Sequence, residues 1–315
     1  MPATPLRLRL ALLVPALLLA LPVLSPALAE EADQGRVIDR LPQVIPHRQR
    51  VEAVNRMLTD RLDNLLPGLM RETGIDMWLV INREYMEDPV YLTLVPEPVF
   101  AARRTTMLVF FDRGPDEGVE RLTVSRYGLG GLYEPAWEGG SDDEQWERLA
   151  QVIRERGPRR IGIDISRDWA FGDGLSAGLH ERLRQALGGK LSSRLISAEA
   201  LCIRWLESRT AMELEAYPDI VALARGVIEE AFSNRVITPG VTTTDDVAWY
   251  IRQRYEDLGL DIWFMPYVNV QRRGDEVEPG TAFYGASGVV IQRGDVLHTD
   301  VGIDYLRLAT DTQEM

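Results

Sequence analysis

DVLHTDVGIDYLRLATD, residues 295–311, is the stretch that decides how the end of this chain folds. Asp300 and Asp311 stand eleven residues apart inside two short runs in which apolar side chains alternate with others. We predict that these runs pair as an antiparallel hairpin that turns around Asp304 to Arg307, which places Asp300 opposite Asp311. Directly opposed residues of such a pair have Cβ atoms about 4.5–5.5 Å apart.

This pairing would bring the two aspartate carboxylates close enough to bind a cation. Two carboxylates held so close repel each other unless a proton or a cation lies between them. Carboxylate oxygens are ligands of hard divalent cations, so Asp300 and Asp311 predict part of a site for one or two such ions. Aspartates also end strands and begin turns, and we interpret Asp304 as a turn residue. Asp300 and Asp311 could likewise be residues that only end a strand or begin a turn, and the sequence leaves this alternative open.

His298 is the histidine that belongs to this stretch. It precedes Asp300 by two positions and therefore shares its face of the strand. That placement lets His298 approach a metal ion or a substrate, whereas the interpretation that we favour is support of a ligand or packing. His47 and His180 lie in no motif of a nucleophile with its base, so the sequence assigns no catalytic residue.

Composition bounds the class of protein and its partners. The 315 residues suffice for two domains, and 45% hydrophobic with 26% charged residues is typical of globular proteins. The net charge of −13 argues against binding to nucleic acid or to anionic membranes, because both require basic patches. The single cysteine, Cys202, excludes an intrachain disulfide, and its apolar neighbours predict a buried thiol.

Residues 1–29 have the order of a secretory signal peptide. Two arginines precede an apolar run from Leu10 to Leu24, and small residues then allow cleavage after Ala29. The alternative is an uncleaved membrane anchor, but this run is shorter than the roughly 20 residues of a spanning helix and contains two prolines. We therefore expect a secreted or periplasmic protein without membrane attachment after cleavage.

The rest of the chain divides into two units. Helical and strand-like segments alternate from about residue 45 to 198, which predicts an α/β domain. We expect helices there over 49–71, 142–155 with Ser141 as its cap, and 175–187, and strands over 77–81, 105–111, 121–126 and 160–165. The second unit should contain a helix over 210–230, another capped by Thr243 or Thr244 that reaches 258, and strands over 263–270, 288–291 and 295–301.

This succession resembles the creatinase, prolidase and aminopeptidase P family of pita-bread metallohydrolases. The resemblance is carried by Pro239-Gly240-Val241 before a capped helix, by Gly294-Asp295-Val296-Leu297 leading into Asp300, and by Asp311-Thr312 after the eleven-residue step. It implies a creatinase-like α/β N-terminal domain over residues 30–198. It further implies that residues 199–315 are the first half of an α+β pita-bread catalytic domain, which is thus incomplete.

The resemblance also implies an activity. In that family both aspartates ligate a dinuclear centre of Mn, Co or Zn, so Asp300 and Asp311 would be the first two metal ligands. The implied reaction is that of a Xaa-Pro aminopeptidase, in which metal-activated water hydrolyses the N-terminal bond of a peptide, and a homodimer is suggested as well. The remaining family ligands, a histidine and two glutamates, lie downstream of the aspartate pair. We therefore expect these 315 residues to be inactive by themselves.

Two alternatives to this activity remain. Within the same fold, a creatinase-like or a dipeptidase-like hydrolase would use the same aspartate pair. A protein of another class, a non-catalytic pita-bread protein that binds a partner or dimerises, would lack the histidine and the two glutamates altogether.

Overall fold

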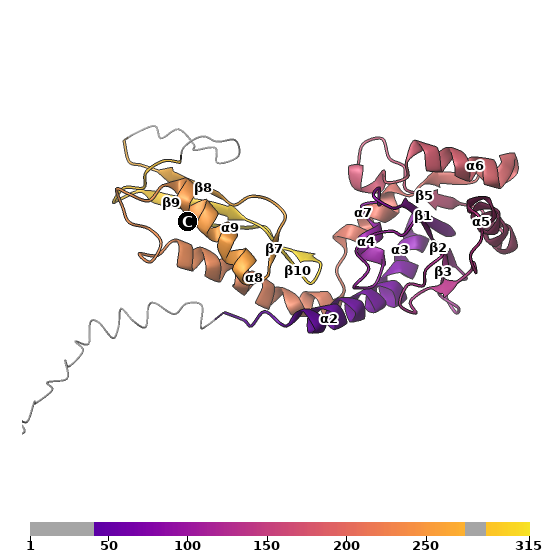
Figure 1. Ribbon diagram of the computed structural model, residues 1–315, viewed down its shortest axis with the longest axis horizontal. Coiled ribbons are helices and arrows are strands. Elements are labelled where there is room, and N and C mark those ends of the chain that lie inside the picture. Colours follow the sequence, from indigo (N-terminus) through magenta and orange to yellow (C-terminus); the bar gives the residue numbers. More distant parts are fainter. Residues whose placement is uncertain (1–40, 275–287) are drawn as a thin grey trace, which may run out of the picture. The chain divides into compact units, whose positions relative to one another are not determined.

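The computed structural model describes residues 41–274 and 288–315 of the chain (Figure 1). The signal peptide expected over residues 1–29 lies outside this part. None of the helices described there is long and apolar enough to cross a membrane.

A six-stranded mixed sheet organises the first half of the described chain, in the order β4-β3-β2-β1-β5-β6. Strand β1 is antiparallel to β2 and parallel to β5. Its side chains enter two different hydrophobic cores in turn, Trp78 and Val80 on one face and Met77 and Leu79 on the other. The strands are β1 (Met77–Arg83), β2 (Thr105–Asp112), β3 (Val119–Val124), β4 (Glu134–Pro135), β5 (Ile161–Ile163) and β6 (Leu195–Ser197).

Helices cover both faces of this sheet (Figure 1). Ser141 caps α5 as predicted, because its hydroxyl accepts the Glu144 N–H while the Glu144 carboxylate accepts the Ser141 N–H. Gly74, in the left-handed region at φ 67°, ends α3. The helices are α2 (His47–Asp60), the π-helical turn η2 (Arg61–Leu65), α3 (Leu66–Thr73), α4 (Tyr91–Leu94), α5 (Asp142–Arg156), the 3-10 helix η3 (Ala170–Gly172), α6 (Ala177–Ser192) and α7 (Glu199–Glu207).

A third hydrophobic core lies among the later elements. It joins α8 (Ala211–Ala231) and α9 (Thr244–Asp257) to two three-stranded sheets, β12-β9-β8 and β11-β10-β7. Thr210 and Thr243 cap the two helices, so Thr243 is the cap residue and Thr244 begins the helix. The strands are β7 (Asp261–Ile262), β8 (Tyr267–Gln271), β9 (Val296–Val301), β10 (Ile303–Tyr305), β11 (Leu308–Ala309) and β12 (Thr312–Glu314).

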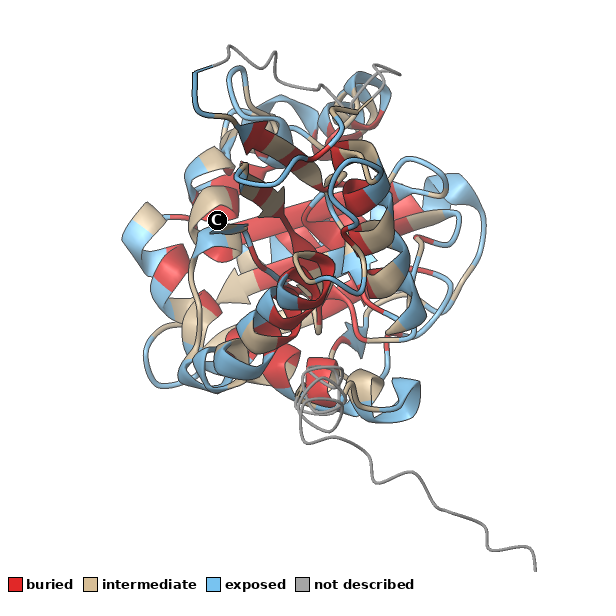
Figure 2. Cartoon of the chain, turned by 90° about the vertical axis from the view of Figure 1, so that its left-hand side faces the viewer, coloured by how far each residue is buried: buried red, intermediate tan, exposed pale blue. Residues whose placement is uncertain are grey.

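Most element predictions are confirmed within a few residues, and one is wrong. Residues 288–291 were expected to form a strand, but Val290 makes only an isolated bridge to Thr243. Cys202 is fully buried in α7, as predicted, and burial raises the pKa of its thiol strongly. Figure 2 shows how the buried residues line the inner sides of the helices and the strands between them.

The β12-β9-β8 sheet has two unlike faces. Val268, Val270 and Val301 point to the core that α8 and α9 share, and β8 and α9 lie side by side (Figure 1). The strand period of two then places Asn269 and Asp300 on the opposite face. An antiparallel sheet commonly has one face in the core and one polar face, and the polar face here carries the candidate site.

Candidate metal centre

Asp300 lies on β9, the central strand of its sheet. It faces Tyr267 of β8 on one side and Gln313 of β12 on the other. Asp311 comes directly before β12, two positions from Gln313, which puts it on the same face as Asp300 and diagonally across from it. The two carboxyl groups interact with each other there. The predicted closeness is therefore confirmed, whereas the predicted direct opposition is wrong.

The turn between β10 and β11 explains this difference. Leu306 and Arg307 form its centre, at φ 58° and 61°, so that Tyr305 pairs with Leu308. A turn centred one residue later than predicted moves every cross-strand partner by two positions, which keeps each side chain on its face. Asp304, interpreted above as a turn residue, instead lies within β10 and pairs with Ala309. Burial is the main cause that raises its pKa.

The charge of Asp300 has little compensation. Partial burial raises the pKa of Asp300, the charge of Asp311 raises it further, and His298 and Gln313 act weakly in the opposite sense. No arginine or lysine of the described residues is among the groups that shift this pKa. Gln313 Nε2 donates to Asp300 Oδ2 at 3.2 Å. The other oxygen, Oδ1, is buried and accepts no hydrogen bond from the described part of the chain.

His298 lies on this face as predicted. Its Nε2 is 3.4 Å from Gln313 Oε1, the amide oxygen of the side chain that also donates to Asp300. Because that oxygen only accepts hydrogen bonds, the proton in this contact is on the imidazole Nε2. His298 thus contacts the amide side chain that also donates to Asp300, and its supporting role stays a prediction.

This arrangement fits a divalent cation. Two carboxylates share one face, and the buried Asp300 Oδ1 accepts no hydrogen bond from the described residues. Carboxylate oxygens are ligands of hard divalent cations. Among residues 41–274 and 288–315, however, no group of three or more His, Cys, Asp and Glu side chains comes close enough to hold a metal. The role of Asp300 and Asp311 as metal ligands therefore stays a prediction.

Sequence analysis missed two residues of this face, Asn269 and Gln313. Asn269 pairs with His298, and its Oδ1 is buried and accepts no hydrogen bond from residues 41–274 and 288–315. The alternation of Tyr267 and Asn269 with Val268 and Val270 was the available signal, because it indicates which residues of β8 leave the core.

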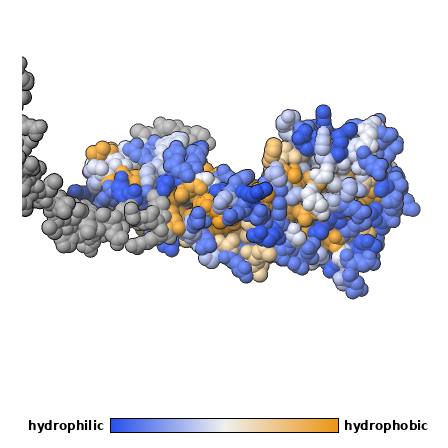
Figure 3. All heavy atoms as spheres, turned by 60° about the horizontal axis from the view of Figure 1, so that its bottom comes forward, coloured by the Kyte–Doolittle hydropathy of each residue, from blue (hydrophilic) through white to orange (hydrophobic). Residues whose placement is uncertain are grey.

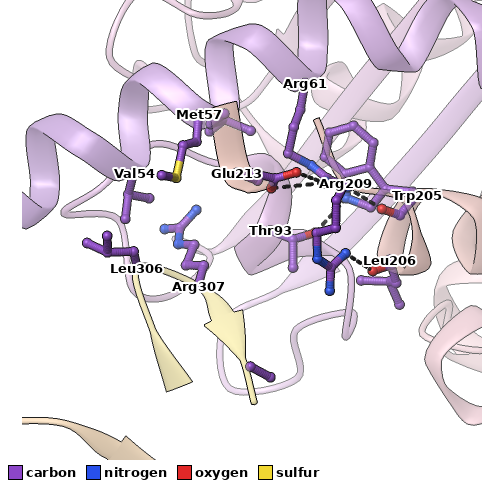
Figure 4. A pocket seen from close by; sticks show the side chains of 12 residues that line it. Val54, Met57, Arg61, Thr93, Trp205, Leu206, Arg209, Glu213, Leu306 and Arg307 are labelled. Carbon is purple, nitrogen blue, oxygen red and sulfur yellow. Dashed lines mark hydrogen bonds and ion pairs between the residues drawn. The ribbon is translucent and has the colours of Figure 1, made fainter. Parts of the chain in front are cut away.

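A separate cavity of about 150 Å³ lies among α2, α7, α8 and the β10–β11 turn (Figure 4). Arg61 points into its wall, where Nη1 is 2.9 Å from Glu213 Oε2 and the guanidinium lies 4.2 Å from the centre of the Trp205 ring. Arg61 also donates to the carbonyl oxygens of Trp205 and Ser208. These contacts join α2–α3 to α8, so we assign them to stability.

The comparisons with known proteins concern structure. No protein-family model and no curated protein matches the chain. Similar solved structures include the X-Pro aminopeptidase from Thermotoga maritima, with 18% identity and a TM-score of 0.54 over 78% of this chain. A dipeptidase from Pyrococcus horikoshii has 16% identity and a TM-score of 0.51 over 82% of this chain. The Xaa-Pro dipeptidase from Bacillus anthracis has 16% identity and a TM-score of 0.50 over 85%.

The chain spans 64% of the length of each of these three structures. Over that share, the six-stranded α/β sheet precedes the α8–α9 helices and their small antiparallel sheets, as the resemblance implied. The chain thus has the fold of the pita-bread proteins of the creatinase and prolidase family, with an α/β N-terminal part followed by an incomplete α+β part.

Proposed function

We propose that this chain is part of a secreted, metal-dependent peptidase of the Xaa-Pro aminopeptidase type. The observation that carries the proposal is the closeness of Asp300 and Asp311 on one polar sheet face, within a fold shared with an X-Pro aminopeptidase. A likeness at 16–18% identity shows the fold alone. The reaction is therefore inferred from the aspartate pair and the chemistry that such pairs support.

Each residue of the pair has a stated role in this proposal. Asp300 and Asp311 bind the cations, two ions of Mn, Co or Zn, through carboxylate oxygens. Gln313 holds Asp300 Oδ2, and His298 holds Gln313, so that the carboxylate keeps one orientation. Bound divalent ions supply a water of lowered pKa and polarise the carbonyl of the peptide bond.

The chain of 315 residues should bind metal without catalysing hydrolysis. The described residues bring together only two of the five ligands that the resemblance implies, and weak binding follows from that small number. Incubation of the purified, Mn²⁺-loaded chain with a Xaa-Pro peptide should release no N-terminal residue. Release that Asp300→Asn abolishes would contradict this expectation while supporting the peptidase.

The rival proposal is a non-catalytic protein that keeps the fold for binding a partner. The observation in its favour is that the described residues hold no complete set of metal ligands. A creatinase-like or dipeptidase-like hydrolase shares the aspartate pair and differs only in the substrate, which assays with creatine and with dipeptides would reveal.

A titration with Mn²⁺ tests the metal site. Free Mn²⁺ is followed by electron paramagnetic resonance in the wild type, in Asp300→Asn and in Asp311→Asn. Asp219→Asn, at an exposed position on α8, is the matched control for the loss of one negative charge. We expect binding in the wild type and the control and its loss in both site variants. Equal binding by all four proteins would overturn the proposal.

Two domains are also part of the proposal, residues 30–198 and 199–315. Separate hydrophobic cores support two such units, two cores flanking the first sheet and one between α8, α9 and the later strands. The core on one face of the first sheet extends past residue 198, because it includes Leu201, Cys202 and Trp205 of α7. Limited proteolysis should therefore cut between α7 and α8 and leave two protected fragments. Fragments with ends inside the six-stranded sheet would refute this boundary.

Export and dimerisation complete the proposal. The protein purified from its source should begin at Glu30, and N-terminal sequencing that finds Met1 would contradict export with cleavage after Ala29. A homodimer is part of the proposal because the resemblance suggests one, and Tyr85 and Phe100, with 93% and 85% of their surface exposed, are candidate contact residues. Apolar residues also gather near the middle of the face shown in Figure 3. Light scattering behind a sizing column measures the mass in solution.

A further inference from the structure

We propose that a groove at one end of the six-stranded sheet binds a small anion that carries two or more phosphate or carboxylate groups. The groove has a volume of about 740 Å³ and lies where β1 and β3 end and β2 begins. Its basic residues, called here the groove arginines, are Arg83, Arg104 and Arg126. All residues that line it belong to the α/β part, so this inference goes beyond the proposed peptidase and does not depend on the metal site.

The strand register explains how the arginines meet. Ile81, Met107 and Val124 face each other across β1, β2 and β3, in the core that includes residues of α5. Arg83 is the last residue of β1, two positions after Ile81, and therefore lies on the same face. Arg126 follows Val124 by two positions, just beyond β3. An apolar layer of the core is thus followed by a basic layer at the end of the sheet.

The charge of the groove arginines is not compensated by the protein. Two carboxylates also line the groove, Glu84 and Asp142, but each pairs with an arginine that does not line it. Glu84 lies 3.7 Å from Arg103, and Asp142 pairs with Arg182. Within residues 41–274 and 288–315, no carboxylate lies at ion-pair distance from a groove arginine. The groove is therefore locally positive in a chain whose net charge is −13, which favours an anion there.

Arg126 is held in place before any anion binds. Its Nη2 donates to the Gly140 carbonyl oxygen at 2.8 Å, and its guanidinium lies 5.8 Å from the centre of the Trp137 ring. A guanidinium that is stacked and hydrogen-bonded in this way loses little freedom when it binds a ligand. Its remaining N–H groups suit the paired oxygens of a phosphate or a carboxylate.

The loops that carry the other two groove arginines are tied together. Glu84 N–H donates to the Arg104 carbonyl oxygen at 2.7 Å, and the Glu84 carboxylate accepts the Arg104 N–H at 3.2 Å. Arg104 and Tyr85 have φ values of 58° and 69°, in the left-handed region. Residues other than glycine adopt this region rarely, and they do so most often at binding and active sites. The backbone thus fixes the spacing of Arg83 and Arg104.

The size of the groove and its residues indicate the class of ligand. Small-molecule sites have volumes of roughly 300–1,000 Å³, a range that includes this groove. Separate guanidinium groups favour an anion with more than one charged group, because each can bind one of them. Tyr127 and Trp137 add aromatic surface for a carbon skeleton between those groups. Phosphate and carboxylate share this chemistry, so the experiment has to distinguish them.

Isothermal titration calorimetry of the metal-free 315-residue chain tests the groove. Pyrophosphate and citrate are the probes, and inorganic phosphate, which has a single charged group, is the comparison. We expect at least one probe to bind more tightly than inorganic phosphate, and the tighter probe identifies the charged group of the ligand. Arg83→Gln, Arg104→Gln and Arg126→Gln should each raise its Kd about tenfold or more.

Arg159→Gln is the matched control. Arg159 also belongs to the α/β part, its side chain is 89% exposed, and Asp76 lies 3.6 Å away as its counter-charge. The control should bind the probe as the wild type does, and thermal melts should show that all variants fold. Should Arg126→Gln not fold, Arg104→Gln decides, because the Arg104 side chain makes no hydrogen bond or ion pair with the described residues.

Modification with phenylglyoxal shows where the anion binds. This reagent forms adducts with accessible guanidinium groups, and mass spectrometry of the digested chain locates them. A saturating probe should protect the groove arginines and leave Arg159 reactive. Failure of both probes to bind, wild-type affinity in the three groove variants, or equal protection of Arg159 would overturn the proposal. Equal affinity for inorganic phosphate and both probes would contradict a ligand with several charged groups.

Discussion

Asp300 and Gln313 face each other across β9 and β12, and the 3.2 Å hydrogen bond between their side chains fixes which oxygen of Asp300 remains open. Asp311, two positions before Gln313, is left diagonal to Asp300 and repels it. The contact with Gln313 thus orients the Asp300 carboxylate, and the repulsion by Asp311 makes a cation favourable beside it. The proposed function and the stability of the metal-free chain would be opposed at this point of the sheet.

Removal of the charge at Asp311 should therefore stabilise the metal-free chain. Burial and Asp311 raise the pKa of Asp300. At a pH above about 4, the ordinary pKa of Asp, ionisation of Asp300 therefore costs more in the folded chain than in the unfolded chain. Asp311→Asn should raise the melting temperature at pH 7, and the gain should vanish in acid, where both carboxyls are protonated. Asp257→Asn, exposed on α9, serves as the control, and an equal gain there would contradict this account.

Gly302 should tolerate no side chain. It lies between β9 and β10, and a Cβ there would collide with the rings of Trp263 and Phe264. Trp263 Nε1 donates to Thr310 O at 2.8 Å, next to Asp311, so a displaced indole should also disturb the proposed metal site. We expect Gly302→Ala to cost about 1–3 kcal/mol in urea unfolding and to weaken Mn²⁺ binding.

Gly178→Ala is the control for that variant. Gly178 lies in α6 with no atom within 4 Å of the added Cβ, so the change should be neutral or stabilising. Equal stability losses in Gly302→Ala and Gly178→Ala would show that the Gly302 contacts have no special weight.

The buried pair of Arg61 and Glu213 should be sensitive to the loss of either partner. Burial lowers the pKa of Arg61 and Glu213 raises it, so Glu213→Leu leaves a guanidinium without its counter-charge. We expect a loss of about 3–5 kcal/mol in unfolding free energy. The double variant Arg61→Met, Glu213→Leu should recover part of it, because the unpaired charge is gone. The Thr210 N–H still lacks its acceptor and the Trp205 and Ser208 carbonyls still lack the Arg61 donor.

An exposed ion pair provides the comparison. Arg204 and Glu72 are 3.0 Å apart with about half of each side chain in solvent, and Glu72→Leu should cost about 1 kcal/mol or less. If Glu213→Leu costs no more than Glu72→Leu, burial of the Arg61 pair does not control stability.

Asp88 and Asp164 should make the stability of the α/β part depend on pH. Both are almost fully buried, at 2% and 1% exposure, and their carboxyl groups interact with each other. Burial and the neighbouring carboxyl raise the pKa of Asp164 well above its ordinary value. A carboxyl with a raised pKa favours folding while it is protonated, so this stability is present in acid and lost as the pH rises through the raised pKa.

Asp164→Asn tests that dependence, because an amide donates to Asp88 at every pH. The melting temperature of Asp164→Asn relative to that of the wild type should rise as the pH increases from acidic to alkaline values. The comparison between the two proteins cancels the carboxyl groups with lowered pKa, such as Asp112 and Glu120, which act in the opposite sense. Asp173→Asn, close to Asp88 but exposed, is the control. Parallel pH profiles of the wild type and Asp164→Asn would contradict a proton held between Asp88 and Asp164.

Local signals explain what the sequence could predict. Ser141 with Glu144 and Thr210 with Glu213 form capping boxes, and these short patterns locate the starts of α5 and α8. The period of two that links His298 to Asp300 needs only the strand itself, so the shared face was predictable. The fold class followed from the alternation of such segments.

Contacts between residues that are distant in sequence explain what the sequence could not predict. The turn at Leu306 and Arg307 has no Asn-Gly or similar signature, although both residues have positive φ. Arg307 donates instead to Glu97 and to the Val95 carbonyl oxygen, more than 200 positions away in sequence. The register of Asp300 depends on this turn, and the register decides that Gln313 faces Asp300.

The most direct test of the proposed metal site is anomalous X-ray diffraction from crystals of the chain grown with Mn²⁺. We predict a Mn²⁺ peak on the polar face of the β12-β9-β8 sheet, within ligand distance of carboxylate oxygens of both Asp300 and Asp311. A map without a peak on that face, or with Mn²⁺ bound only elsewhere, would contradict the account.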